Sequence, residues 1–251
     1  MILFVSGRCD IPAYFSNWFF NRLKEGYVDV RNPFNPHQIS RIILNEANID
    51  VIIFCTKNPL PMLPRLKEIP FPYIFHVTLT GYHKDIEQAV PDKKAIIEGI
   101  KKMSSQLGSK RVIVRYDPIL LNDVYTIEYH CRAFERLCKQ LEGYVETVII
   151  SFVDMYKNTR KNMAKMKLQP LEEAQMKMIG KAFGEIAHKY HMHIQSCAEK
   201  VDLSMYGIEA RPCMNMEDIT QAIGYSFEKP KGKGVREQVC GCIASVDIGD
   251  Y

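Results

Sequence analysis

Short runs of consecutive apolar and β-branched residues recur along the whole chain. Strand-like runs occupy residues 2–6, 28–32, 51–55, 73–80, 111–116, 147–153, 192–197 and 243–248. Between most of them, apolar residues recur near the 3.6-residue period of an amphipathic helix, at 13–24, 92–106, 125–141 and 171–190. Strands that alternate with helices predict a parallel sheet with helical crossovers. We therefore expect a single (β/α)8 TIM-barrel-like α/β domain over residues 1–251.

Two segments fit this pattern less well than the rest. Residues 33–50 are compatible with a hairpin, and the helix signals in 199–239 are short. The chain has no linker rich in Gly, Ser or Pro, no repeat of fixed period and no low-complexity tract. One domain is therefore the simpler interpretation.

Composition and charge narrow the class of protein. Of the 251 residues, 47% are hydrophobic and 25% are charged, which is typical of a globular protein. The formal charge of +4 is spread along the chain, so it favours an anionic small molecule only weakly. We expect a cytoplasmic protein with no membrane partner, because the N-terminus lacks a secretory pattern and no apolar run approaches a membrane span. In that compartment, the 8 cysteines are expected to be reduced thiols or metal ligands.

Polar residues follow most of the strand candidates. In a (β/α)8 barrel the active site lies at the carboxyl ends of the strands, so these side chains are expected to meet at one mouth. Such a mouth suits a small polar or anionic substrate, because Arg and Lys bind carboxylate or phosphate groups. Candidate binding residues are Arg8, Asp10, Arg31, Asn32, Asn58 and Arg115. Candidate catalytic residues are Asp117, Asp154 and Glu199 as acid or base, with Lys57 as an electrophilic partner.

A structural explanation stays open for each of these residues. Charged residues at strand ends are commonly solvated, or form Arg–Asp pairs that tie adjacent loops together. In "RYDPILLND" (115–123), Arg115 and Asp117 share one face of a strand. Arg115 is therefore either an anion-binding residue held by its neighbouring acid or half of a buried ion pair that supports the turn.

The cysteines of the last quarter form a separate candidate site. Cys197, Cys213, Cys240 and Cys242 supply the four thiolates that a tetrahedral zinc ion or a [4Fe–4S] cluster takes. Their spacing, C-x15-C-x26-C-x-C, matches no standard zinc motif. The sequence leaves both kinds of centre open.

Six stretches together resemble the DUF1848 family over essentially the whole chain. They are "SGRCDIPAYFSNWFFNRLKEGYVDVRNPFNP" (6–36), "FCTKNPLPML" (54–63), "RYDPILLND" (115–123), "SFVDMYKNTRKN" (151–162), "SCAEKVDLSMYGI" (196–208) and "CGCIASVDIGDY" (240–251). The family pattern continues into a C-x3-C-x2-C tail like the cluster motif of radical S-adenosylmethionine enzymes. The resemblance implies that residues 240–251 are the last strand, leading to such a tail, which is absent from these 251 residues.

The resemblance also implies cofactors. Tail cysteines would hold a [4Fe–4S] cluster that binds S-adenosylmethionine, and Cys197, Cys213, Cys240 and Cys242 would hold a second cluster. The family pattern has Thr in place of Cys9 and Trp in place of Cys55, so these two are poor ligand candidates.

Three classes of function follow, in order of preference. The first is an iron–sulfur enzyme resembling radical S-adenosylmethionine proteins, which acts on a small polar or anionic substrate and needs an electron donor. The second is a cluster-free barrel lyase or hydrolase that uses the strand-end carboxylates with Lys57 and Arg115. The third, a nucleic-acid-binding module, is least favoured because the basic residues are dispersed.

Overall fold

The computed structural model divides into two compact units. Unit 1 comprises Met1–Val77, Pro91–Val112 and Met214–Tyr251, and unit 2 comprises Thr78–Val90 and Ile113–Cys213. The residues that the structure describes are 1–7, 9–32, 35–153, 168, 170–228, 236–237, 241–244 and 246–249.

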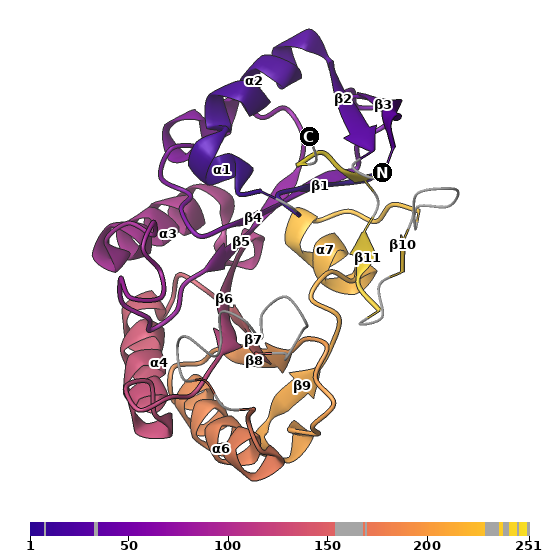
Figure 1. The fold of residues 1–251 in the computed structure, drawn as a ribbon. Coiled ribbons are helices and arrows are strands. Elements are labelled where there is room, and N and C mark those ends of the chain that lie inside the picture. Colours follow the sequence, from indigo (N-terminus) through magenta and orange to yellow (C-terminus); the bar gives the residue numbers. More distant parts are fainter. Residues whose placement is uncertain are drawn as a thin grey trace. The chain divides into compact units, whose positions relative to one another are not determined.

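An eight-stranded sheet is the main feature of the fold (Figure 1). Its order is β12 (Val246–Asp247), β1 (Ile2–Val5), β4 (Val51–Thr56), β5 (Tyr73–Thr78), β6 (Val112–Ile119), β7 (Thr147–Phe152), β8 (His193–Ser196) and β9 (Ile208–Ala210). The pairs β12–β1, β1–β4, β4–β5, β6–β7, β7–β8 and β8–β9 are parallel. The predicted α/β class is confirmed.

The order of the strands is the one that a (β/α)8 barrel requires. It follows the chain, except that the last strand returns beside the first. The two outer strands in this order are β12 and β9, and in the part of the chain that the structure describes they form no pair. Closure into a barrel therefore stays a prediction.

One predicted strand of the main sheet lies elsewhere. The run at 28–32 forms β2 (Tyr27–Asn32), which pairs antiparallel with β3 (Asn35–Ile43) in a separate two-stranded sheet. The short strand β9 takes its place in the main sheet. Arg31 and Asn32 were expected at a carboxyl end of the main sheet, and this placement is wrong. Arg31 is exposed in the hairpin, and Asn32 Nδ2 donates to Gln38 Oε1 at 2.8 Å.

Unit 1 contains four helices among its described residues. They are α1 (Ile11–Tyr14), α2 (Ser16–Glu25), α3 (Lys93–Leu107) and α7 (Met216–Ile223), with the short 3-10 helices η1 (Leu63–Glu68) and η2 (Ser109–Arg111). The helices expected at 13–24 and 92–106 are confirmed, the first as α1 and α2. The two-residue strands β10 (Arg236–Glu237) and β11 (Ile243–Ala244) also pair antiparallel here.

Unit 2 is built around two long helices that pack against each other (Figure 1). They are α4 (Ile127–Leu141) and α6 (Glu173–Lys189), and both were predicted; η3 (Ser204–Tyr206) follows β8. The rings of Phe134 on α4 and Phe183 on α6 stack with centroids 4.0 Å apart. Tyr116 of β6 meets both rings edge-on, at 5.4 and 5.5 Å. This buried aromatic cluster fixes the two helices against the strand that carries Arg115 and Asp117.

Candidate metal centre

Cys197 and Cys213 follow neighbouring strands of unit 2. Cys197 comes directly after β8, and its backbone N–H donates to the carbonyl of Ile150 at 3.2 Å. The ladder between β8 and β9 extends past the end of β9, because Arg211 N–H donates to the carbonyl of Ser196 at 3.0 Å. The chain that carries Cys213 therefore leaves the sheet beside Cys197.

Cys242 reaches the same place through a backbone contact. Ile243 N–H donates to the carbonyl of Met214 at 2.9 Å, and these two residues are the chain neighbours of Cys242 and Cys213. The sulfur atoms of Cys197, Cys213 and Cys242 all lie within 4.8 Å of one another. Three of the four predicted metal ligands are thus brought together. The fourth, Cys240, lies outside the described residues.

The donor set of this cysteine trio suits a metal ion. Cys197 and Cys242 are buried, with 7% and 1% of their surfaces exposed, and Cys213 is half-buried. Three thiolates are soft ligands, which select zinc, iron or copper(I) over calcium or magnesium. The trio could therefore hold a metal ion.

The loop after Cys197 has an unusual conformation. Ala198 has φ of +63°, in the left-handed region that residues with a side chain rarely adopt. The next residue, Glu199, turns back to the sheet, where its Oε1 accepts a hydrogen bond from Phe152 N–H at 2.7 Å. The expected catalytic residue Glu199 is thus bonded to the end of β7, one residue beyond that left-handed turn.

Three other predicted site residues meet at the ends of β1 and β4 in unit 1. Asp10 caps α1 by accepting from Ala13 N–H at 3.0 Å, and it also accepts from Thr56 Oγ1 at 2.6 Å and Lys57 N–H at 2.7 Å. Burial raises the pKa of the Asp10 carboxyl group above its ordinary value, although these hydrogen bonds oppose the shift. Asn58 N–H in turn donates to Thr56 Oγ1 at 2.9 Å.

Arg115 and Asp117 form the expected ion pair on β6 in unit 2. Their side chains are 18% and 9% exposed, so the pair is largely removed from solvent. The sequence left open whether this pair binds an anion or supports the turn, and its geometry is compatible with both roles. Two further candidates, Arg8 and Asp154, lie outside the described residues.

Asp247 is a structural residue that the sequence pattern did not single out. Its Oδ1 accepts from Gly7 N–H at 3.3 Å and Gly249 N–H at 2.8 Å, so it joins the ends of β1 and β12. A Cβ atom at Gly7 would lie 2.0 Å from Asp247 Oδ2, so a larger residue there would displace this carboxylate. Burial, and then the charges of Asp10 and Asp247, raise the pKa of the Cys9 thiol. Cys9 is therefore held in the protonated form, which binds metals poorly.

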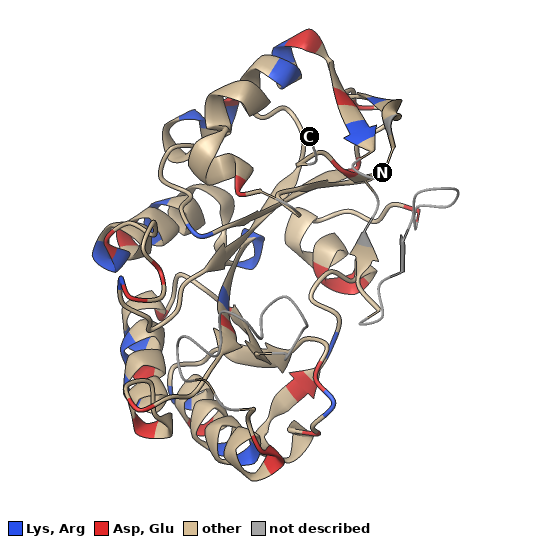
Figure 2. Ribbon diagram, viewed as in Figure 1, with Lys and Arg blue, Asp and Glu red and all other residues tan. Residues whose placement is uncertain are grey.

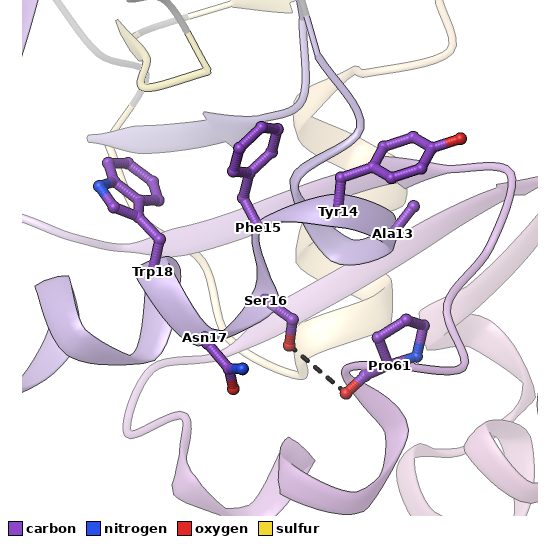
Figure 3. A pocket seen from close by; sticks show the side chains of 7 residues that line it. All are labelled: Ala13, Tyr14, Phe15, Ser16, Asn17, Trp18 and Pro61. Atoms are coloured by element: carbon purple, nitrogen blue, oxygen red, sulfur yellow. Dashed lines mark hydrogen bonds between the residues drawn. The ribbon is translucent and has the colours of Figure 1, made fainter.

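A small pocket lies on the loops that follow β1 and β4. It has a volume of about 210 Å³ and is formed by the junction of α1 with α2 and by Pro61. Figure 3 shows the rings of Tyr14, Phe15 and Trp18 on one side of this junction, and Ser16 on the other. Ser16 Oγ donates to the Pro61 carbonyl at 3.4 Å, which holds the junction against the loop after β4.

Comparisons with known proteins place the chain in a family. The model described as "Domain of unknown function (DUF1848)" matches residues 2–251. The chain belongs to the DUF1848 family. A search of curated proteins finds no match to this DUF1848 protein.

A solved structure described as "a putative alpha-L-fucosidase from Bacteroides thetaiotaomicron VPI-5482" is similar to the chain at 10% sequence identity, with a TM-score of 0.33. The match covers 90% of this DUF1848 protein and 84% of the other chain.

The described surface of the DUF1848 protein carries charges of both signs. Figure 2 shows acidic and basic residues interspersed along α3, α4 and α6. Many form ion pairs, for example Lys101 with Glu98 within α3 at 2.9 Å and Lys189 of α6 with Glu135 of α4 at 2.6 Å. Within the described residues, no helix has the length and apolar character needed to span a membrane.

Proposed function

We propose that this DUF1848 protein is an iron–sulfur enzyme of radical S-adenosylmethionine type that acts on a small polar or anionic substrate. Cys197, Cys213, Cys242 and Cys240 would be the ligands of its thiolate centre. The observation that carries the thiolate centre is the gathering of three sulfur atoms within 4.8 Å from segments that are far apart in the sequence. Buried thiols otherwise serve as small apolar side chains, and that role does not require three of them to meet.

The iron–sulfur part of the proposal rests on the sequence. The sequence resembles a family pattern in which a cysteine-rich tail follows this region, which implies iron–sulfur chemistry. A [4Fe–4S] cluster held by that tail would supply one-electron reduction of S-adenosylmethionine, and the four-thiolate centre would be a second cluster. The chain's own part would be to hold the thiolates, two of which are buried, and to bind a polar substrate through a cation such as Arg115 of unit 2.

A second candidate is an enzyme with a single tetrahedral metal ion, acting as a lyase or hydrolase. Zn–S bonds of about 2.3 Å place two thiolate sulfurs about 3.8 Å apart around one tetrahedral ion. Each thiolate of a [4Fe–4S] cluster binds a different iron, so the ligand sulfurs are farther apart than around one ion. The 4.8 Å limit on the trio favours the single ion in this respect. In that enzyme, Asp117 or Asp154 would act as acid or base.

Metal and sulfide analysis of protein purified without oxygen tests both candidates. The first candidate predicts brown protein that contains iron and acid-labile sulfide in comparable amounts. The second predicts one zinc or iron ion per chain without sulfide. Protein of either kind should lose its metal when Cys197, Cys213 and Cys242 are each changed to Ser. Cys131→Ser, on α4 and outside the trio, is the matched control and should keep the metal. Wild-type protein without any metal would contradict both candidates.

A further inference from the structure

The hydrogen bond of Glu199 replaces a bond of the parallel ladder. In the β7–β8 pair, Ile150 lies opposite Ser196, and Cys197 N–H donates to the Ile150 carbonyl. If the ladder continued, Phe152 N–H would donate to the carbonyl of Cys197. Instead, Phe152 N–H donates to Glu199 Oε1 at 2.7 Å. A side-chain carboxylate therefore occupies the position at which β8 would have gone on.

The conformation of Ala198 makes this replacement possible. A φ of +63° turns the chain away from β7 directly after Cys197 and brings the Glu199 side chain back to the end of the strand. A left-handed alanine costs on the order of 1 kcal/mol, so such a residue persists only where its surroundings hold it. Two hydrogen bonds hold Ala198 in this conformation. One runs from Cys197 N–H to the Ile150 carbonyl, and the other from Phe152 N–H to the Glu199 carboxylate.

We propose that Glu199 is a positioning residue of the thiolate centre. It fixes the end of the Cys197 loop, so that the Cys197 sulfur is held in the place where it meets the other two. This inference rests on the proposed metal centre, and it gives Glu199 a role through Cys197 in place of the acid–base role that its position after β8 suggested. Replacing residues that orient metal ligands in this way typically weakens metal binding by about 10–100-fold.

In this role the hydrogen bond from Phe152 N–H to Glu199 matters, and the negative charge of Glu199 does not. Gln at position 199 has the same length as Glu and keeps an oxygen that accepts from Phe152 N–H, but it has no charge. Asp keeps the charge, but its side chain is one methylene shorter and does not reach Phe152 N–H. An acid or base in catalysis would be replaced better by Asp than by Gln, whereas a positioning residue would be replaced better by Gln.

Cobalt binding to the metal-free full-length protein tests the inference. Co²⁺ is the probe, its thiolate charge-transfer absorption is the readout, and competition with a chelator gives the affinity. We expect Glu199→Asp and Glu199→Ala to weaken Co²⁺ binding by about tenfold or more, in the range seen for residues that orient metal ligands. Glu199→Gln should stay within about threefold of wild type on the same basis. Ala198→Gly, which accepts a positive φ without strain, should also bind like wild type.

Each outcome decides one of the two claims. Equal binding by wild type and all Glu199 variants would overturn the positioning role and leave the metal centre intact. Weak binding by the Gln variant with normal binding by the Asp variant would also overturn it, because the charge would then be the property that matters. A wild-type protein that shows no thiolate charge-transfer band would refute the metal centre itself. If Glu199→Ala fails to fold, the comparison of Glu199→Gln with Glu199→Asp still tests the positioning role, because neither of these substitutions creates a large cavity.

Discussion

Replacing Asp10 tests whether one carboxylate joins α1 to the end of β4. In Asp10→Ala, the N–H groups of Ala13 and Lys57 and the hydroxyl of Thr56 lose their acceptor. The capping bond contributes about 1 kcal/mol. Each of the other two, made to an ionised acceptor, contributes about 1.5 kcal/mol at the lower end of its range. The ionised carboxylate is itself costly to bury, as its raised pKa shows, which offsets part of this sum. We expect a net loss of about 2–4 kcal/mol in the free energy of unfolding.

Urea unfolding followed by tryptophan fluorescence measures this loss. Trp18 is the sole tryptophan of the chain and lies on α2, in the same unit as Asp10. With a urea dependence of about 2 kcal/mol per molar, the midpoint should fall by roughly 1–2 M. Asp10→Asn should lose less, about 1–2 kcal/mol, because its oxygen still accepts two of the three bonds.

Asp29→Ala is the matched control for this experiment. Asp29 is also an acid of unit 1, but it is exposed and is paired with Arg41 at 2.7 Å on the hairpin. An exposed ion pair contributes little to stability because solvent screens it, so this variant should unfold close to wild type. If Asp10→Ala unfolds at the same urea concentration as Asp29→Ala, the joining role assigned to Asp10 is wrong.

Two further predictions concern buried residues within the units. Gly184→Ala would place a Cβ atom 2.0 Å from the carbonyl oxygen of Tyr206, so we expect a loss of about 3 kcal/mol or more in a urea titration. Gly99→Ala meets only the tip of a leucine side chain at 2.7 Å and should cost less; equal costs would refute the argument. His130 is fully buried, its Nδ1 is 2.9 Å from Tyr116 Oη, and burial lowers its pKa. The folded protein therefore binds this proton less readily than the unfolded chain, so the stability of the wild type should fall as the pH drops below about 6.5, relative to His130→Gln. Parallel pH profiles for the two proteins would contradict this.

The pattern of apolar residues predicts the main sheet because most of its strands are buried on both faces. The residues of β4 and β7 are nearly all buried, and their sequences "VIIFCT" and "TVIISF" are continuous apolar runs, as in parallel sheets covered by helices. The segment "YVDVRN" of β2 alternates apolar and polar residues, which is typical of a hairpin with one solvated face. That alternation could have excluded β2 from the main sheet.

The strand β9 was not predictable from local sequence. Its three residues, "IEA", are too few and too polar to stand out from a loop. Its place is set by pairing with β8, which is a contact between distant segments. The same contact brings Cys213 near Cys197, so the spacing of the cysteines carried no sign of their meeting.

The sequence predicted the kind of candidate site and its cysteines, but not how its residues are arranged. Counting thiols in the last quarter of the chain singled out Cys197, Cys213 and Cys242, and the structure brings these three together. The roles of the strand-end charges could not be assigned in the same way. Whether an acid such as Asp10 contacts a substrate or bonds its neighbours depends on backbone N–H groups, whose directions the sequence does not show.

X-ray absorption at the metal edge of protein purified without oxygen tests the central claim most directly. A centre built on these thiols predicts three or four sulfur neighbours about 2.3 Å from the metal, lost together when Cys197, Cys213 and Cys242 are changed to Ser. A nearby shell of iron atoms would identify the cluster, and its absence the single ion. A metal surrounded only by nitrogen and oxygen atoms, or a spectrum unchanged in the serine variants, would contradict a centre built on these thiols.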